Sequence, residues 1–431
     1  MSYNSVVWTR DPNTLKPILC VAGKLPKQIQ LLDIETGARV RSLLGHGRGI
    51  NDLAISPLAP YILASASEDY TIRLWDLRPE YASQPCIAVF AGEGHRQPIL
   101  AIKFHPNGRW LLSGGLDTAV ALWAVPSLAD LQRTPEQLQR HHDPITVFRP
   151  HFHSTEVHSD FVDCLDFYGD LIISRCARTP PEGTDTSQRP KSNPNELVLW
   201  QINGFDANSS TLPTPPVLEP NKWTRSAFPP TPGNSVGFTR LLTFDMPHTD
   251  RFYNRFDLLN RPGMRPLLAM GNQESAFCFW DLQKLEEGYD ASDPAEWTKK
   301  TKAKRKGAPP RKLTKDALAA QTNTTTALSN LNLRAPSVHS DANSSAVGGG
   351  AAAAIADLSR STSVSIAPER KFDLSDPMKP LLPHCKVTAD TKLSRTHHFG
   401  LRQLAWSPDG KWMVGVGDTG MMCIFHREVA A

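Results

Sequence analysis

A unit that begins with Gly-His and closes on Trp occurs twice in the first third of this 431-residue chain. The first copy spans residues 45–76, and His46 stands 29 residues before Trp75; in the second copy His95 stands 28 residues before Trp123. Each copy holds two short β-type runs around an acidic turn, such as ILASAS and TIRLW around EDY, which indicates a β-hairpin. A single hairpin cannot bury its own faces, so the pattern predicts a ring of such units, a β-propeller.

Six blade-like units can be counted along the chain, ending near residues 34, 76, 124, 201, 281 and 426. The predicted fold is an all-β WD40 β-propeller with six visible blades of an expected seven, since seven is the commoner way for such a ring to close. The first strand-like run, YNSVVW, begins at residue 3. We therefore expect either a six-bladed ring or an N-terminal blade that is missing from this version of the sequence.

Three stretches divide the predicted propeller. Residues 1–282 read as five blade units, with loop insertions expected near 126–156, 177–195 and 206–234. Residues 283–394 are of low complexity and contain a basic run at 299–312, and their scarcity of large apolar side chains predicts disorder. Residues 395–431 read as the final blade.

Composition excludes several classes of protein. A formal net charge of +4 is small for this length and does not by itself indicate nucleic-acid binding. The seven cysteines form no CxxC pair, and the His pairs at 141–142 and 397–398 lack partner ligands, so no metal and no cofactor is expected. The chain shows no leader and no apolar run near the roughly 20 residues that span a bilayer, so we expect a soluble, non-secreted protein without a membrane partner.

The polar residues of the two clear units are assigned to scaffolding. In each unit His, Ser, Asp and Trp can form a buried hydrogen-bonded chain, because buried polar groups need partners. The predicted chains are His46, Ser65, Asp69 and Trp75 in the first unit, and His95, Ser113, Asp117 and Trp123 in the second. A Ser-His-Asp nucleophile would be one exposed site, whereas this set repeats at the same spacing, so no catalytic residue is predicted.

Beyond the repeats, specific stretches resemble the EED / extra sex combs family, the WD-repeat subunit of Polycomb repressive complex 2. The similar stretches are VVWTRD with PILCVAG, GHGRGINDL, EGHRQPIL, HSDFVDCLDFYGDLIIS, DRFYNRFDLL with LLAMGNQ, and THHFGLRQLAWSPD. The resemblance covers most blades. It implies a non-catalytic propeller that grips a helix of a SET-domain histone methyltransferase on one face and holds a trimethylated lysine of histone H3 in an aromatic cage on the other.

The resemblance also implies which residues form that cage. The paired aromatics match Phe252 and Tyr253, and because the family usually has Trp where Phe252 stands, weaker lysine binding is expected. The third cage position matches Asn4; a β-bulge would bring the neighbouring Tyr3 in, so Tyr3 is the third candidate. A fourth aromatic belongs to a blade that would precede this chain. The family's pore-lining residues match Asn51, Phe161, Asp163 and Arg255.

Two functions follow as hypotheses of different classes. The first is a nuclear scaffold and trimethyl-lysine reader of a Polycomb-type methyltransferase complex, with other Polycomb subunits as partners and transcriptional silencing as its role. The alternative is a general WD-repeat adaptor, such as the substrate receptor of a ubiquitin ligase, that has no methyl-lysine cage. Neither hypothesis makes the chain an enzyme.

Overall fold

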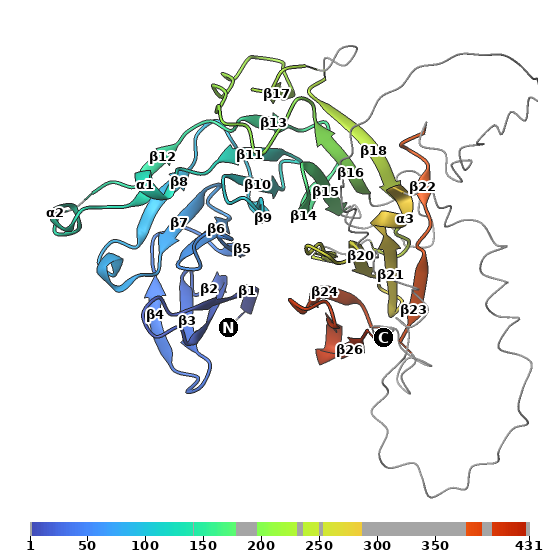
Figure 1. The fold of residues 1–431 in the computed structure, drawn as a ribbon, viewed down its shortest axis with the longest axis horizontal. Helices are drawn as coiled ribbons and strands as arrows, with labels where there is room; N and C mark the ends of the chain where they lie inside the picture. The colour runs from blue at the N-terminus through green and yellow to red at the C-terminus, as the bar shows by residue number, and fades with distance from the viewer. Residues whose placement is uncertain are drawn as a thin grey trace, which may run out of the picture.

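The computed structural model describes residues 2–140, 142–177, 196–230, 236–249, 253–286, 376–389 and 399–427. Within these ranges six β-sheets follow one another in chain order around a central pore (Figure 1). The prediction of an all-β WD40-type propeller with six blades in this sequence is confirmed.

In each of the first three sheets the strands succeed one another outward from the one nearest the pore. The first sheet contains β1 (Ser2–Arg10), β2 (Pro17–Leu25), β3 (Ile29–Asp33) and β4 (Arg39–Leu43). The second contains β5 (Ile50–Ile55), β6 (Ile62–Ser67), β7 (Ile72–Asp76), β8 (Cys86–Phe90) and β12 (Ile145–Val147). The third contains β9 (Ile99–Phe104), β10 (Trp110–Gly115), β11 (Val120–Ala124), β13 (Phe152–Ser154) and β17 (Thr224–Ser226).

The last three sheets continue the ring. The fourth contains β14 (Phe161–Tyr168), β15 (Leu171–Ala177), β16 (Leu197–Ile202), β18 (Phe238–Phe244) and β22 (Pro380–Leu381). The fifth contains β19 (Asp257–Leu259), β20 (Leu267–Gly271), β21 (Ala276–Asp281) and β23 (Cys385–Thr388), and the sixth contains β24 (Leu401–Trp406), β25 (Trp412–Gly417) and β26 (Met422–His426).

Helices are few and short in the described ranges. They are the 3-10 turns η1 (Pro79–Tyr81) and η4 (Asp418–Gly420) and the α-helices α1 (Leu128–Leu131), α2 (Pro135–Leu138) and α3 (Leu282–Glu286). In that part of the chain, no helix has the length and apolar character needed to cross a membrane.

Each predicted unit supplies the three inner strands of one sheet. The third strands end at Asp33, Asp76, Ala124, Ile202, Asp281 and His426, within one residue of the unit ends expected from the sequence. The fourth strand of each of the first five sheets comes later in the chain, on the far side of a turn or an insertion.

The expected insertions contain more sheet than the sequence predicts. Residues 126–156 hold α1 and α2, but also β12, which pairs in parallel with β8, and β13, which pairs with β11. Within 206–234, β17 pairs with β13 as the outermost strand of the third sheet. The loop at 178–195 lies outside the described residues.

The expectation of disorder throughout 283–394 needs correction at both ends, because residues 283–286 belong to α3. Residues 376–389 form β22, which adds to β18, and β23, which pairs with β21 and completes the fifth sheet. The physical reason is that the backbone N–H and C=O groups on the outer edge of β21 need hydrogen-bond partners, and β23 supplies them. The basic run at 299–312 lies outside the described residues.

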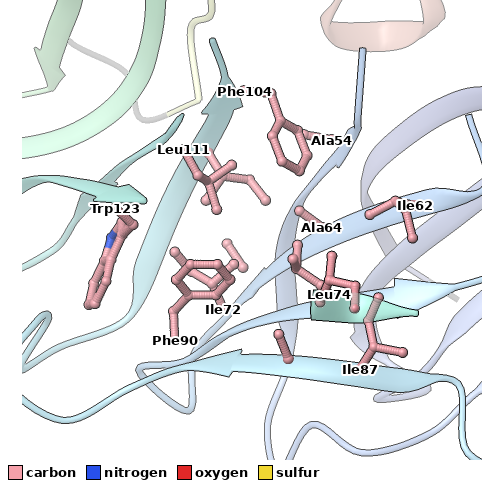
Figure 2. Packing of buried hydrophobic residues seen from close by; sticks show 14 of the residues in the cluster. Ala54, Ile62, Ala64, Ile72, Leu74, Ile87, Phe90, Phe104, Leu111 and Trp123 are labelled. Carbon is pink, nitrogen blue, oxygen red and sulfur yellow. The ribbon is translucent and has the colours of Figure 1, made fainter. Parts of the chain in front are cut away.

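The core is divided among the spaces between neighbouring sheets. Five clusters of buried apolar side chains join consecutive sheets, from the first pair to the fifth and sixth. Figure 2 shows the cluster between the second and third sheets, where Leu74 and Phe90 face Leu111 and Trp123. Because most sheets are covered on both faces, their inner strands are mostly apolar or small, as in ILASAS of β6, which is buried at every position.

The first and last sheets are each covered on one face only within the described residues. On β1, Val7 packs against the core while Val6 and Trp8 are exposed, Trp8 by 62%. On β25 and β26, Met413 and Phe425 are buried whereas Trp412, Val416, Met422 and Ile424 are exposed. The alternation along each strand therefore leaves two apolar sheet faces open to solvent.

Candidate functional site

The inner strands carry β-bulges near the points where they begin. A bulge inserts one extra residue into a strand and re-aims its side chain. The extra residues, read from the shifts in strand register, are Asn4 in β1, Asn51 in β5, Leu100 in β9, Asp163 in β14 and Arg402 in β24. These strands line the pore in Figure 1, so the bulges lie along an arc at one of its mouths.

Hydrogen bonds connect these bulges from blade to blade. The Asn4 side-chain amide donates to the Ile50 carbonyl at 3.0 Å and lies 3.4 Å from Asn51 Oδ1. The Asn51 amide donates in turn to the Ile99 carbonyl at 2.8 Å. The Arg255 backbone N–H donates to the Arg402 carbonyl at 2.8 Å. The pore mouth is thus a hydrogen-bonded frame and not a set of independent loops.

An ion pair crosses the ring from β5 to the segment before β19. Arg255 Nη1 donates to Asp52 Oδ1 at 2.7 Å, and Arg255 Nη2 donates to the Leu100 carbonyl at 3.1 Å. Ser5 Oγ also donates to Asp52 Oδ1, at 2.9 Å. Burial acts to lower the pKa of Arg255, but the Asp52 carboxylate leads the groups that raise it, and the net shift is upward. Arg255 therefore stays charged at the mouth.

Tyr253 is an aromatic residue held beside this ion pair. Its backbone has φ of 57°, in the left-handed region, and its N–H donates to Asp163 Oδ2 at 2.9 Å. The Arg255 guanidinium carbon lies 5.6 Å from the centre of the Tyr253 ring, within the range of cation–π attraction. Burial raises the pKa of the phenol, so the ring is neutral. A neutral aromatic ring at this place can contact a cation.

The sequence-predicted site residues lie at several places around this mouth. Asn51 and Asp163 are bulge residues, and Phe161 begins β14 two residues before Asp163. Tyr3 is 46% exposed, and its hydroxyl donates to Gln30 Oε1 at 3.2 Å. The anticipated bulge is present beside Tyr3, yet its extra residue is Asn4, whose amide reaches Asn51. Phe252 lies outside the described residues.

Sequence reasoning missed the charged residues farther along the pore. Lys103 Nζ lies 2.7 Å from Asp166 Oδ2, and Asp257 accepts a hydrogen bond from the Trp406 N–H at 2.8 Å. Burial raises the pKa of Asp257, although Lys103 opposes the shift. These residues line a cavity of about 500 Å³ that also contacts Asp52 and Arg255. The sequence does indicate these residues, because charged side chains interrupt the otherwise apolar segments that form β5, β9 and β14.

The two scaffold chains have the geometry expected from their spacing. His46 Nδ1 lies 2.9 Å from Asp69 Oδ2 and His46 Nε2 lies 2.7 Å from Ser65 Oγ, which also accepts the Trp75 indole N–H at 2.8 Å. The second unit repeats the pattern at 2.8 to 3.0 Å with His95, Ser113, Asp117 and Trp123. Each His side chain is fully buried, so neither unit presents a nucleophile to a substrate.

The fourth blade contains a variant of this chain. His158 Nε2 lies 2.6 Å from Ser174 Oγ, which accepts the Trp200 indole N–H at 2.8 Å. Glu196 approaches His158 Nδ1 at 3.8 Å, and the ligand-type atoms of His158, Glu196 and Cys176 lie within 4.8 Å of one another. Both oxygens of Glu196 are bound by the Arg240 guanidinium, at 3.3 and 3.0 Å, which disfavours a bound cation there. This cluster is best described as scaffold.

Comparison with known proteins agrees with this architecture. The family model "WD domain, G-beta repeat" matches residues 37–76, 84–124 and 391–426. The chain is 41% identical to Polycomb protein EED of Chaetomium thermophilum over 287 residues. This aligned region covers 65% of this chain and 46% of that protein. The chain is 27% identical over 303 residues to Polycomb protein esc of Drosophila melanogaster, covering 68% of this chain and 59% of that protein. The chain thus spans about half the length of these curated relatives.

Solved structures give a similar result. A chain of the humanized mutant of the Chaetomium thermophilum Polycomb Repressive Complex 2 bound to the inhibitor GSK343 is 32% identical, with a TM-score of 0.69, and the match covers 99% of this chain and 82% of that one. A chain of ctPRC2 in complex with H3K27me3 and H3K27M is 31% identical, with the same TM-score and coverage.

The fold and the hydrogen-bonded pore mouth define a WD-repeat β-propeller. This class agrees with the expectation from the sequence that the chain is not an enzyme. Within it, the chain belongs to the EED / extra sex combs family of Polycomb proteins.

Proposed function

We propose that this chain is a non-catalytic scaffold of a Polycomb-type histone methyltransferase complex and that its pore mouth reads a trimethylated lysine of histone H3. Membership of the EED / extra sex combs family supports the scaffold role. The similar solved structure that contains H3K27me3 supports the histone ligand. The proposed partners are a SET-domain methyltransferase, bound through a helix on a propeller face, and other Polycomb subunits. The proposed location is the nucleus.

The observation that carries the lysine-reading proposal is the placement of Tyr253. A trimethylammonium group keeps its positive charge but has no N–H to donate, so only aromatic faces and carboxylates attract it. The Tyr253 ring is neutral and the residue is partly buried, and its backbone N–H is held at the pore mouth by a hydrogen bond to Asp163. Phe252, the preceding residue, is the second proposed wall of the cage. Tyr3 is the third, although its hydroxyl bonds to Gln30.

Peptide binding tests this proposal. The chain should bind a trimethylated H3 peptide more tightly than the unmethylated peptide, and Tyr253→Ala should weaken trimethyl-lysine binding about 30-fold, the equivalent of the roughly 2 kcal/mol of a desolvated cation–π contact. Trp223→Ala is the matched control, because Trp223 is 65% exposed and lies on the outer part of the third blade, beside β17. Equal affinity for the two peptides would contradict the lysine-reading role.

Co-purification separates the scaffold from the alternative adaptor. A tagged form of the chain should recover a SET-domain methyltransferase from nuclear extract. Recovery of ubiquitin-ligase subunits without any methyltransferase would instead support the general WD-repeat adaptor.

A further inference from the structure

A fully buried ion pair lies under the segment that carries Tyr253. Arg175, on β15, is 1% exposed and Asp163, on β14, is 0% exposed. Arg175 Nη1 contacts both carboxylate oxygens of Asp163, at 2.6 and 2.5 Å. Asp163 is the bulge residue of β14, and this explains how a strand residue comes to face the loop that connects β18 with β19.

The pair holds that loop at two points. Arg175 Nη2 donates to the Thr249 carbonyl at 2.5 Å, and Asp163 Oδ2 accepts the Tyr253 N–H at 2.9 Å. Thr249 is itself fully buried, and its hydroxyl donates to the Met246 carbonyl at 2.9 Å. The two attachment points therefore bracket residues 250–252 and fix where the Tyr253 backbone lies.

The backbone of Tyr253 needs such support. A φ of 57° is uncommon and strained for a bulky residue, so it persists only where surrounding contacts hold it. Overall stability, in contrast, gives little reason for the ion pair, because replacing a buried pair with apolar side chains is often neutral or even stabilising. The directed hydrogen bonds to Thr249 and Tyr253 are what an apolar replacement could not provide.

We propose that Arg175 and Asp163 are positioning residues for methyl-lysine recognition: they set the backbone of Tyr253 so that its ring faces the cation. This inference rests on the proposed lysine-reading function. Neither residue touches the ligand. Their effect is therefore on selectivity for the trimethylated form, whereas a merely structural role would change the binding of all peptides equally.

The test compares Arg175→Gln and Asp163→Asn with a matched control, Arg225→Gln. Arg225 is 2% exposed and also contacts an acidic residue twice, through Glu93 Oε2 at 3.3 Å and the Glu93 carbonyl at 2.7 Å, but it lies on β17 away from the mouth. Arg175→Lys is the conservative variant, which keeps the charge but loses the two-armed geometry. All are measured with trimethylated and unmethylated H3 peptides, well below their melting temperatures.

Loss of the pair should lower the ratio of the two affinities about tenfold, with Arg175→Lys in between and Arg225→Gln within about twofold of the unsubstituted chain. In the free protein, amide hydrogen exchange of residues 246–256 should become faster in Arg175→Gln and Asp163→Asn only. The inference is overturned if both peptides weaken equally, or if these variants differ no more than the control does.

The two proposals fail in distinguishable ways. If the unsubstituted chain does not discriminate between the peptides, lysine reading is wrong, while the exchange data still show whether the pair holds the loop. If the chain discriminates and the pair variants discriminate equally well, only the positioning role is wrong.

Discussion

At the scale of single residues, the buried polar side chains differ in whether their hydrogen-bond partners can be predicted from the sequence. The His-Ser-Asp-Trp chains could be derived from spacing, because a buried His, Ser or indole N–H requires partners and the repeat supplies the same ones each time. The pore charges could not be assigned partners in this way. Asp52 and Arg255 are 203 residues apart and meet only because the ring brings β5 close to the segment before β19.

Removing the shared hydroxyl of one chain should destabilise the protein without affecting peptide binding. Ser65→Ala would leave the Trp75 indole N–H and His46 Nε2 buried without their partner, which predicts a loss of about 2 to 3 kcal/mol in the free energy of unfolding. Urea unfolding measures the effect. Ser83→Ala, at an exposed position, is the control and should change stability by less than about 0.5 kcal/mol. Similar losses in both variants would count against the scaffold role.

His153 gives the protein a predictable sensitivity to acid. Burial, with help from the nearby His95 and Arg225, lowers its pKa from 6.5 to about 3. Below pH 6.5 the unfolded chain therefore takes up a proton that the folded chain does not, and stability falls as the pH is lowered toward 3. Between pH 7 and pH 5 the unsubstituted chain should lose about 1 to 2 kcal/mol more than His153→Gln does. Urea unfolding at both pH values checks this, and parallel losses would refute it.

Secondary-structure elements show where sequence reasoning is sufficient and where it is not. Most of the three inner strands of each sheet were predictable, because they are short, largely apolar segments between turn residues. The outermost strands β12, β17 and β22 are two or three residues long and form by pairing with an existing edge, so no local pattern distinguishes them from loop. The bulges were equally hidden, since they depend on the partner strand.

Close packing between neighbouring blades yields a test at this scale. A Cβ added to Gly114 on β10 would lie 2.6 Å from Val162 Cγ1 and 3.0 Å from the Val162 carbonyl oxygen on β14. Gly114→Ala should therefore force the third and fourth blades apart and cost about 2 kcal/mol of unfolding free energy. Gly47→Ala is the matched control, because its nearest neighbour would lie 4.0 Å away. Thermal unfolding of the two variants should differ clearly, and equal melting temperatures would disprove the close contact.

In the whole molecule, the first and last sheets differ from the four between them, because no neighbouring sheet within the described residues covers their outer faces. Five apolar clusters join the six sheets, while the outer faces of the first and last sheets present Trp8, Trp412, Met422 and other large apolar side chains to solvent. Contiguous exposed apolar surface of this kind promotes association. The sequence predicted the repeat, but only the three-dimensional arrangement shows which faces remain uncovered.

These faces should make the isolated chain self-associate at micromolar concentration. Trp8→Gln should shift sedimentation velocity profiles toward the monomer, because it removes a large apolar group from an open sheet face. Trp223→Gln, which changes a tryptophan of similar exposure outside these faces, should not. If both variants, or neither, reduced association, the open faces would not be its cause.

The proposed function requires the pore mouth to recognise a quaternary ammonium group through aromatic faces. The most direct measurement compares two H3 peptides that differ only in replacing the trimethylammonium nitrogen with carbon, which keeps the shape and removes the charge. The chain should bind the charged peptide at least about tenfold more tightly, because a neutral group gains no cation–π attraction. Equal binding of the charged and neutral peptides would contradict recognition of the cation by aromatic faces.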